Sequence, residues 1–384
     1  MQIQMAVNEN LETPFRQESA VIDCLRGLAA LGVVIFHARV TFWVGWREIS
    51  GHPADYSEFE RAAAWLAAPA PFLGSLVMLF FVVSGFCVHQ PVARLPAWGP
   101  FFARRFLRIY PPYLGAVFAS FFAGQLLALP GLSPGRVLAT AVMAQNYTAG
   151  MASPVSACQL AANPALWSLP VELELYLVYP AVWFLARTRG WGVALTAVAF
   201  VTAAALVAFH AGARFLEGNF ALYWIIWSGG AWLREHFAAG TLRTVPRAVT
   251  ALACLALLLA IWLTLRGDGG AINVVWGGFY CWLLWWLLVT GVGRGWPPAL
   301  VTALQAMGRW SYSLYLLHFP LLTALGVWWV AQRGGKPASF LLCLGGCAAI
   351  LPAAWLFHRI IERPSHQWAR RVATRLSVAG VVVS

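Results

Sequence analysis

Long apolar segments recur along the whole 384-residue chain and are separated by polar connections. A helix that crosses a bilayer needs about 20 apolar residues, and ten segments meet that length. They lie near 22–44, 71–92, 111–130, 165–186, 191–211, 219–235, 247–265, 272–293, 311–331 and 339–361. The longest polar connections are 45–70 and 131–164. The pattern predicts an all-α integral membrane protein with about ten transmembrane helices.

The composition supports a membrane protein and argues against a soluble domain and against a nucleic-acid-binding protein. Apolar residues make up 60% of the chain and charged residues only 10%, whereas soluble domains carry about 25% charged residues. The net charge of +12 does not indicate nucleic-acid binding, because the basic residues are scattered between apolar segments. The seven Cys residues have neither zinc-site spacing nor the pattern of a disulfide framework, so we expect no metal.

The distribution of basic residues predicts the orientation in the membrane. With the N-terminus inside, 18 of the 26 Lys and Arg residues fall in inner segments and 8 in outer ones, so both termini are predicted to be cytoplasmic. We expect a cytoplasmic segment over 1–20, a transmembrane domain over 21–362 and a cytoplasmic tail over 363–384. The tail is expected to be an interfacial helix on the inner leaflet of a plasma (inner) membrane.

Ionisable residues inside apolar spans are costly and usually functional. Arg26 and His37 on the first span are 11 residues apart, so they share a helix face about 16 Å apart. This spacing suits a ligand with an anionic head and a long thin arm, such as coenzyme A. The alternative is an Arg that fixes topology and a His that bonds to a neighbouring helix. Arg105 and Arg108 also share a helix face and can bind phosphate bidentately, although basic juxtamembrane segments are common topology signals.

Two further spans carry ionisable groups. Glu172 is expected about 10 Å below the outer surface, at the same rough depth as His37, so the two could form a catalytic or a structural pair. His318 precedes Pro320, which frees a backbone carbonyl, so it is as readily structural as ligand-binding. The Ser84-Gly85 pair is expected to permit close helix approach rather than to supply a nucleophile.

Taken together, these segments resemble the acyltransferase 3 family of integral-membrane acyltransferases. The resemblance covers roughly residues 20–365 and rests on five stretches that occur in family order. They are Leu25 to Ala30 leading to His37, Phe80 to Phe86, Arg104 to Pro111, Trp167 to Glu172, and Ser311 to His318. The resemblance implies transfer of an acyl group, most often acetyl from acetyl-CoA, to a hydroxyl of a sugar-containing acceptor.

The resemblance also implies roles for single residues. Arg26 and His37 match the family's central pair, Arg105 and Arg108 its second signature, and Glu172 its fourth-helix Glu. Trp167, Ser168 and His318 are possible substrate-binding or structural residues. The family often has an acidic or amide pair directly after that Glu, whereas Leu173-Glu174 follows here, so Glu174 is not expected in the site.

The expected mechanism brings acetyl-CoA in from the cytoplasm, with its phosphates on the three Arg residues. His37, oriented by Glu172, then acts as general base on an acceptor hydroxyl from the outer side; an acetyl-His intermediate is the less favoured variant. The acceptor could be a cell-surface polysaccharide, a lipid-linked oligosaccharide or a small glycoside. The rival class is a secondary transporter with a proton relay through His37, Glu172 and His318, but the sequence shows no paired inverted repeat.

Overall fold

The computed structural model describes residues 2–382 except 130–131, 149, 151, 154–155, 157–158, 268 and 293–294. Within these residues the chain forms sixteen α-helices and no strand. Their bounds are α1 (Gln2–Thr41), α2 (Trp46–Gly51), α3 (Glu58–Ala64), α4 (Leu76–Val88), α5 (Trp98–Leu126), α6 (Pro134–Ala141), α7 (Ser168–Arg189), α8 (Trp191–His210), α9 (Trp224–Ala238), α10 (Arg247–Arg266), α11 (Gly269–Thr290), α12 (Pro298–Gly308), α13 (Ser311–Arg333), α14 (Phe340–Ala349), α15 (Leu351–Phe357) and α16 (Arg363–Val382).

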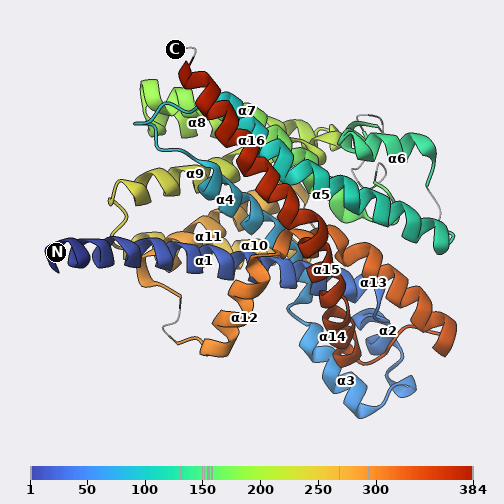
Figure 1. Ribbon diagram of the computed structural model, residues 1–384. Coiled ribbons are helices and arrows are strands. Elements are labelled where there is room, and N and C mark those ends of the chain that lie inside the picture. The colour runs from blue at the N-terminus through green and yellow to red at the C-terminus, as the bar shows by residue number, and fades with distance from the viewer. Residues whose placement is uncertain are drawn as a thin grey trace.

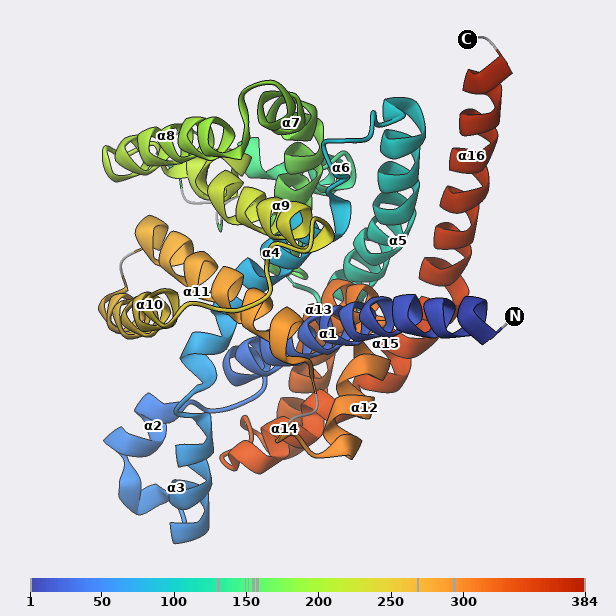
Figure 2. The same cartoon turned by 90° about the vertical axis from the view of Figure 1, so that its left-hand side faces the viewer.

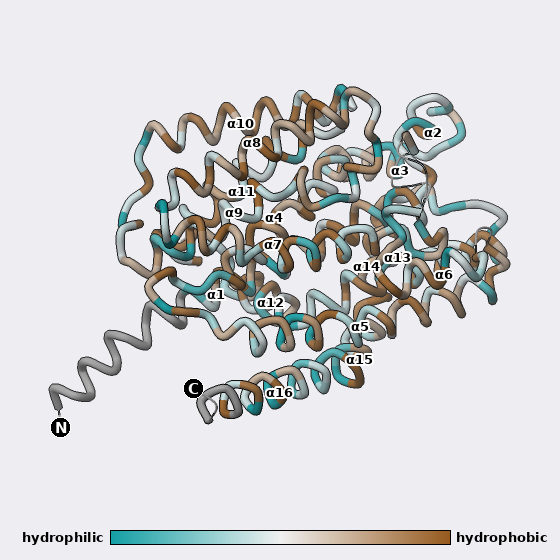
Figure 3. Tube along the Cα trace, turned by 90° about the horizontal axis from the view of Figure 1, so that it is seen from above, coloured by the Kyte–Doolittle hydropathy of each residue, from teal (hydrophilic) through white to brown (hydrophobic). Residues whose placement is uncertain are grey.

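Eight helical segments of the described chain are long and apolar enough to cross a membrane, which confirms the all-α membrane class. They are Glu18–Thr41, Glu58–Val88, Pro164–Arg189, Trp191–His210, Arg247–Arg266, Gly269–Thr290, Ser311–Arg333 and Phe340–Val378. The other two of the ten predicted spans are the helices α5 and α9. The first half of α5 carries three Arg residues, and α9 has only 15 residues. Both nevertheless lie within the bundle (Figures 1 and 3).

The long helices run side by side (Figures 1 and 3). The short helices α2 and α3 lie together at one end of the bundle, and α6 lies at the same end but apart from them (Figures 1 and 3). The last helix, α16, packs along α5 at the edge of the bundle (Figure 2). It runs toward the end of the bundle at which the coloured part of α1 in Figure 3 begins (Figures 1 and 3). That this end faces the cytoplasm stays a prediction from the charge count. Cys158, in the predicted outer connection, lies outside the described residues.

Glycines allow two helix pairs to approach closely. A Cβ added at Gly85 of α4 would lie 1.9 Å from the Trp227 carbonyl oxygen of α9, and one at Gly230 would lie 2.0 Å from the Val82 oxygen. This confirms that the Ser84-Gly85 pair permits close approach. A similar contact joins α1 to α12, where a Cβ at Gly27 would lie 2.1 Å from the Leu304 oxygen. The first contact fixes α4, and with it Ser84, against α9.

Because α4 and α9 touch through backbone atoms, Gly85→Ala should destabilise the protein. The added methyl group meets a carbonyl that cannot give way without moving a helix, so we expect a loss of about 1–3 kcal/mol in unfolding free energy. Gly278→Ala in α11 is the matched control, since a Cβ there meets nothing within 4 Å. Thermal unfolding of both purified variants tests the contact. A melting temperature of Gly85→Ala equal to that of the control would contradict it.

Polar contacts fasten the last helix to the two helices that carry site residues. A π-helical turn, His358–Glu362, joins α15 to α16 and directs Glu362 inward. The Glu362 carboxylate accepts hydrogen bonds from the Ser313 backbone N–H at 3.1 Å and from its hydroxyl at 2.5 Å, at the beginning of α13. The Ser365 hydroxyl donates to the Leu107 carbonyl of α5. These contacts hold the beginning of α13 and the arginine-bearing part of α5 against one helix.

Candidate active site

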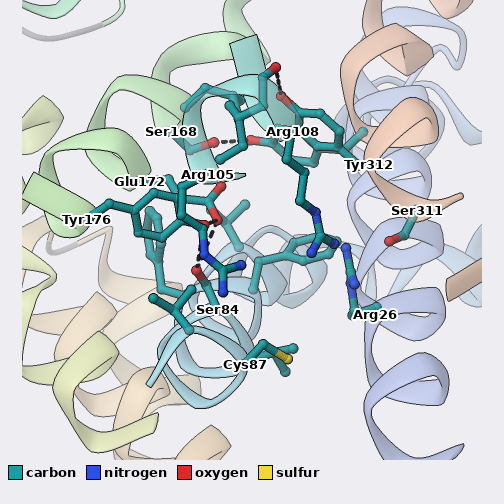
Figure 4. Close-up of a pocket in the computed structure, with 18 residues that line it drawn as sticks. Arg26, Ser84, Cys87, Arg105, Arg108, Ser168, Glu172, Tyr176, Ser311 and Tyr312 are labelled. Carbon is teal, nitrogen blue, oxygen red and sulfur yellow. Dashed lines mark hydrogen bonds between the residues drawn. The ribbon is translucent and has the colours of Figure 1, made fainter. Parts of the chain in front are cut away.

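A cavity of about 800 Å³, counted to its open mouth, lies between α1, α4, α5, α7 and α13. We call it the Arg cavity, because Arg26 of α1 and Arg105 and Arg108 of α5 line it. Figure 4 shows that the three guanidinium groups point into the same space, with Arg26 and Arg108 next to each other. The other lining side chains are mostly apolar or hydroxyl-bearing, and Glu172 is the only carboxylate among those described.

None of the three arginines forms an ion pair or hydrogen bond with another residue that the structure describes. Arg105 is held instead by stacking, with its guanidinium carbon 5.7 Å from the Phe101 ring centroid and 6.0 Å from that of Tyr176. Its Nε atom is buried without a partner. Three converging cations repel one another, and the single carboxylate among the described lining residues, Glu172, forms no ion pair with any of them. The arrangement is therefore suited to bind an anion with several charges.

Glu172 belongs to a hydrogen-bonded group on the wall of the Arg cavity. Its Oε1 accepts from the Ser84 hydroxyl at 2.9 Å and from the Tyr176 hydroxyl at 2.5 Å. The Trp227 indole N–H donates to the Ser84 hydroxyl at 3.3 Å. The Ser84 and Tyr176 bonds both reach the same oxygen of the carboxylate, whereas the Trp227 bond reaches it only through Ser84. Glu174 is not among the described lining residues of this cavity, and its carboxylate accepts from the Tyr147 hydroxyl and the Phe220 N–H.

The expected pairing of Glu172 with His37 is wrong: no hydrogen bond joins them in the described chain. The expectation placed Glu172 from the apolar window alone. In the structure α7 begins only at Ser168, whose hydroxyl bonds to the Tyr315 hydroxyl at 2.7 Å. This contact sets Glu172, one turn later, level with Ser84 of α4 rather than with His37.

The partner of His37 is instead His318. The Nδ1 atom of His37 lies 3.0 Å from Nε2 of His318 and 3.1 Å from the Val33 carbonyl oxygen. The Nδ1 atom of His318 lies 2.7 Å from the Tyr315 carbonyl oxygen. His318 is fully buried, whereas the His37 ring is half-buried between Phe36 and Phe319.

These contacts define the tautomer of the neutral pair. A carbonyl oxygen only accepts, so Nδ1 of His318 carries the proton and its Nε2 is the acceptor. Nδ1 of His37 must then carry a proton and donate it to His318. The remaining ring nitrogen of His37, Nε2, keeps its lone pair. His318 therefore leaves His37 with one free basic nitrogen, as general-base catalysis requires.

His37 lines a second cavity of about 720 Å³, counted to its mouth, which we call the His37 cavity. Its lining comes from α1, the 3₁₀ turn Ala70–Ser75 before α4, Trp167 before α7, and the helices α10 and α11. The two cavities meet at Val77, which lines both, and the neighbours Trp167 and Ser168 lie one in each. Arg26 and His37 thus open from one helix into two adjoining cavities.

Sequence reasoning missed three groups that shape the Arg cavity. Tyr176 was detectable, because it follows Glu172 by four residues and therefore lies on the same helix face. Ser84 was assigned only to helix packing, although its hydroxyl faces the cavity. Tyr315, whose hydroxyl donates to the Ala165 carbonyl at 2.8 Å, carried no signal beyond its place in the Ser311-to-His318 stretch.

Within an all-α membrane bundle, three arginines thus converge in one cavity, and His37, with one basic ring nitrogen, lines the adjoining cavity. The sequence model of the acyltransferase 3 family, described as an acyltransferase domain, matches residues 20–359. The chain therefore belongs to this family and is a membrane acyltransferase. It is similar to acyltransferase MdmB of Streptomyces mycarofaciens, with 26% identity over 342 residues that cover 76% of this chain and 81% of MdmB. No solved structure matches the chain significantly.

Proposed function

We propose that the protein transfers an acyl group, acetyl first among them, from acyl-CoA to a hydroxyl of a carbohydrate-containing acceptor at the plasma (inner) membrane. The observation that carries the proposal is the set of three unpaired arginines in the Arg cavity, beside the cavity that holds His37. An anionic nucleotide with a long neutral arm matches this order of groups along α1.

The donor half of the proposal uses the Arg cavity. Arg26, Arg105 and Arg108 hold the phosphates of acetyl-CoA, because guanidinium forks bind phosphate oxygens bidentately. Glu172, Ser84 and Tyr176 form one ordered wall of the cavity. The pantetheine arm extends past Val77, the residue common to both cavities, and brings the thioester to His37.

The chemical step uses the free nitrogen of His37. Its Nε2 takes the proton of the acceptor hydroxyl while that oxygen forms a bond to the thioester carbonyl carbon. The tetrahedral intermediate then breaks its C–S bond, and the CoA thiolate takes a proton from the imidazolium. His318 positions the ring through the Nδ1 contact and supports the positive charge that His37 carries meanwhile. Direct transfer needs no covalent acyl-enzyme.

The proton-relay transporter is disfavoured by the placement of its three groups. His37 and His318 contact each other, but Glu172 is bonded to Ser84 and Tyr176 in the other cavity, so the three form no continuous relay. Purified protein incubated with acetyl-CoA and a mixed glycan extract should release free CoA and form acetylated glycan. Failure to bind or cleave acetyl-CoA would contradict the proposed function.

Arg108→Ala should weaken acetyl-CoA binding at least about tenfold, because one bidentate phosphate contact is lost. Arg108→Lys should recover little, since a point charge does not replace the fork. The measurement is isothermal titration of the purified variants with acetyl-CoA. Arg104→Ala is the matched control, because Arg104 is exposed and does not line the Arg cavity. Equal dissociation constants for the Arg108 and Arg104 variants would exclude Arg108 from the donor site.

Glu172→Gln tests the role of the carboxylate in the Arg cavity. The amide keeps the shape and an acceptor oxygen but removes the negative charge near three arginines, so we expect tighter phosphate binding together with slower turnover. Phosphate binding should tighten because the cavity attracts the anion more strongly. Turnover should slow because the hydrogen bonds from Ser84 and Tyr176 to the carboxylate are weakened. Acetyl-CoA affinity and kcat of the folded variant are measured together. Weaker acetyl-CoA binding with an unchanged melting temperature would contradict this account.

A further inference from the structure

The His37 cavity has a lining without formal charge. No Asp, Glu, Lys or Arg is among its described lining residues. Aromatic rings form much of its wall, from Phe36, Phe72, Trp167 and Trp276. A cavity with aromatic walls and a few placed polar groups is typical of sites for uncharged ligands.

Its polar side chains differ in whether they are already paired. The Ser75 hydroxyl lies 2.6 Å from the Tyr280 hydroxyl. The Thr264 hydroxyl donates to the Ala260 carbonyl at 2.7 Å and accepts from the Trp276 indole N–H at 3.2 Å. The Asn273 amide, by contrast, has no hydrogen-bond partner among the residues that the structure describes. It projects from α11, a membrane-spanning helix, where an unpaired amide is costly.

The Asn273 amide offers two donors and one acceptor oxygen to whatever occupies the cavity. Hydroxyl groups match this set, because each both donates and accepts. His37 lines the same cavity, and its free Nε2 needs one hydroxyl to deprotonate. The rings supply flat apolar surfaces for the C–H faces of the same ligand.

We infer that the His37 cavity is the acceptor site, that Asn273 is a specificity-determining residue, and that the acceptor group bound there is an uncharged ring bearing several hydroxyls. Anionic rings such as uronic acids are excluded, because no cation in the lining would pair with their charge. The inference rests on the proposed function, since it assigns the second substrate of that reaction.

A neighbouring cavity of about 940 Å³ is the competing location. It is lined by the end of α1, by α13 and by Leu129 and Ala161 of the connection between α5 and α7, and it contains Lys336, so it would favour an anionic acceptor. His37 is not among its lining residues, and the Lys336 ammonium already donates to the Val40 carbonyl at 2.8 Å. The base therefore faces the uncharged cavity and not the basic one.

Protection of His37 from diethyl pyrocarbonate tests the inference without requiring turnover. The full-length protein in lipid nanodiscs is treated in the presence of the methyl glycosides of glucose, galactose, mannose and rhamnose, or of glucuronic and galacturonic acid. Mass spectrometry of the His37 peptide gives the modification rate. At least one neutral glycoside should slow this rate about fivefold or more, and the uronides should leave it unchanged.

Asn273→Leu should raise the concentration of neutral glycoside needed for protection about tenfold, because it removes the unpaired amide. Thr323→Val is the matched control, since it removes one polar group from the neighbouring cavity. Protection by uronides alone, equal protection in Asn273→Leu and wild type, or no protection by any neutral glycoside would each overturn the inference. Acetyl-CoA binding by the same samples separates the two proposals: its loss in the wild type contradicts the proposed function, whereas normal binding with failed protection contradicts the acceptor site alone.

Discussion

His37→Ala should lower the rate of acyl transfer by about 10²–10⁴-fold, the usual contribution of a positioned general base. The variant should still bind acetyl-CoA with wild-type affinity, because the three arginines that we propose to hold the phosphates line a separate cavity. The expected result is therefore a collapse of kcat with an unchanged dissociation constant for the donor. Turnover per folded molecule, measured beside isothermal titration, gives both quantities.

The control for this variant is its stability. His37 contributes one hydrogen bond to His318, and Ala leaves that imidazole without its donor, so a modest fall in melting temperature is expected. Acetyl-CoA should raise the melting temperature of His37→Ala as much as that of the wild type. Turnover within a factor of two of wild type in a folded sample would remove His37 from the mechanism.

The second large effect concerns His318, which we place as a positioning residue. His318→Asn should lower kcat about 10²-fold, because its short amide cannot reach the point where Nε2 accepts the proton of His37 Nδ1. His318→Gln is one methylene longer and presents an amide oxygen near that point, so it should retain most of the lost activity. The acetyl-CoA dissociation constant should be the same in both.

This pair of variants separates positioning from packing. Both replace a fully buried ring by an amide, so a purely structural role would impair them alike and would show in their melting temperatures. Nitrogen-15 spectra of labelled histidine add a direct test. The wild type should show His37 with a protonated Nδ1, and His318→Asn should show a mixture of tautomers. Equal kcat in the Asn and Gln variants would contradict the positioning role.

The sequence predicted those features that are determined within a single helix, namely where it lies in the chain and which residues share a face. The apolar windows located the helices, and the spacing of Arg105 and Arg108 placed both on the face of α5 that lines the Arg cavity. The pairing of His37 with His318 was not predictable, because it depends on how α1 and α13 lie against each other across 281 residues of chain. The expected pairing of Glu172 with His37 failed for the same kind of reason: a hydropathy window does not show which neighbouring helix a side chain faces.

The meeting of the two cavities at Val77 bears on how acyltransferases of this kind diversify. The proposed donor site is built from α1, α4, α5, α7 and α13, whereas much of the His37 cavity is built from α10, α11 and the turn before α4. Substitutions on α10 and α11 can therefore change which acceptor is acylated without changing how the donor is bound. Conversely, substitutions on α5 can change how the donor is bound without altering the lining of the His37 cavity. Under the proposed function, the donor site and the acceptor site can therefore change at separate rates, while the chemical step at His37 stays the same.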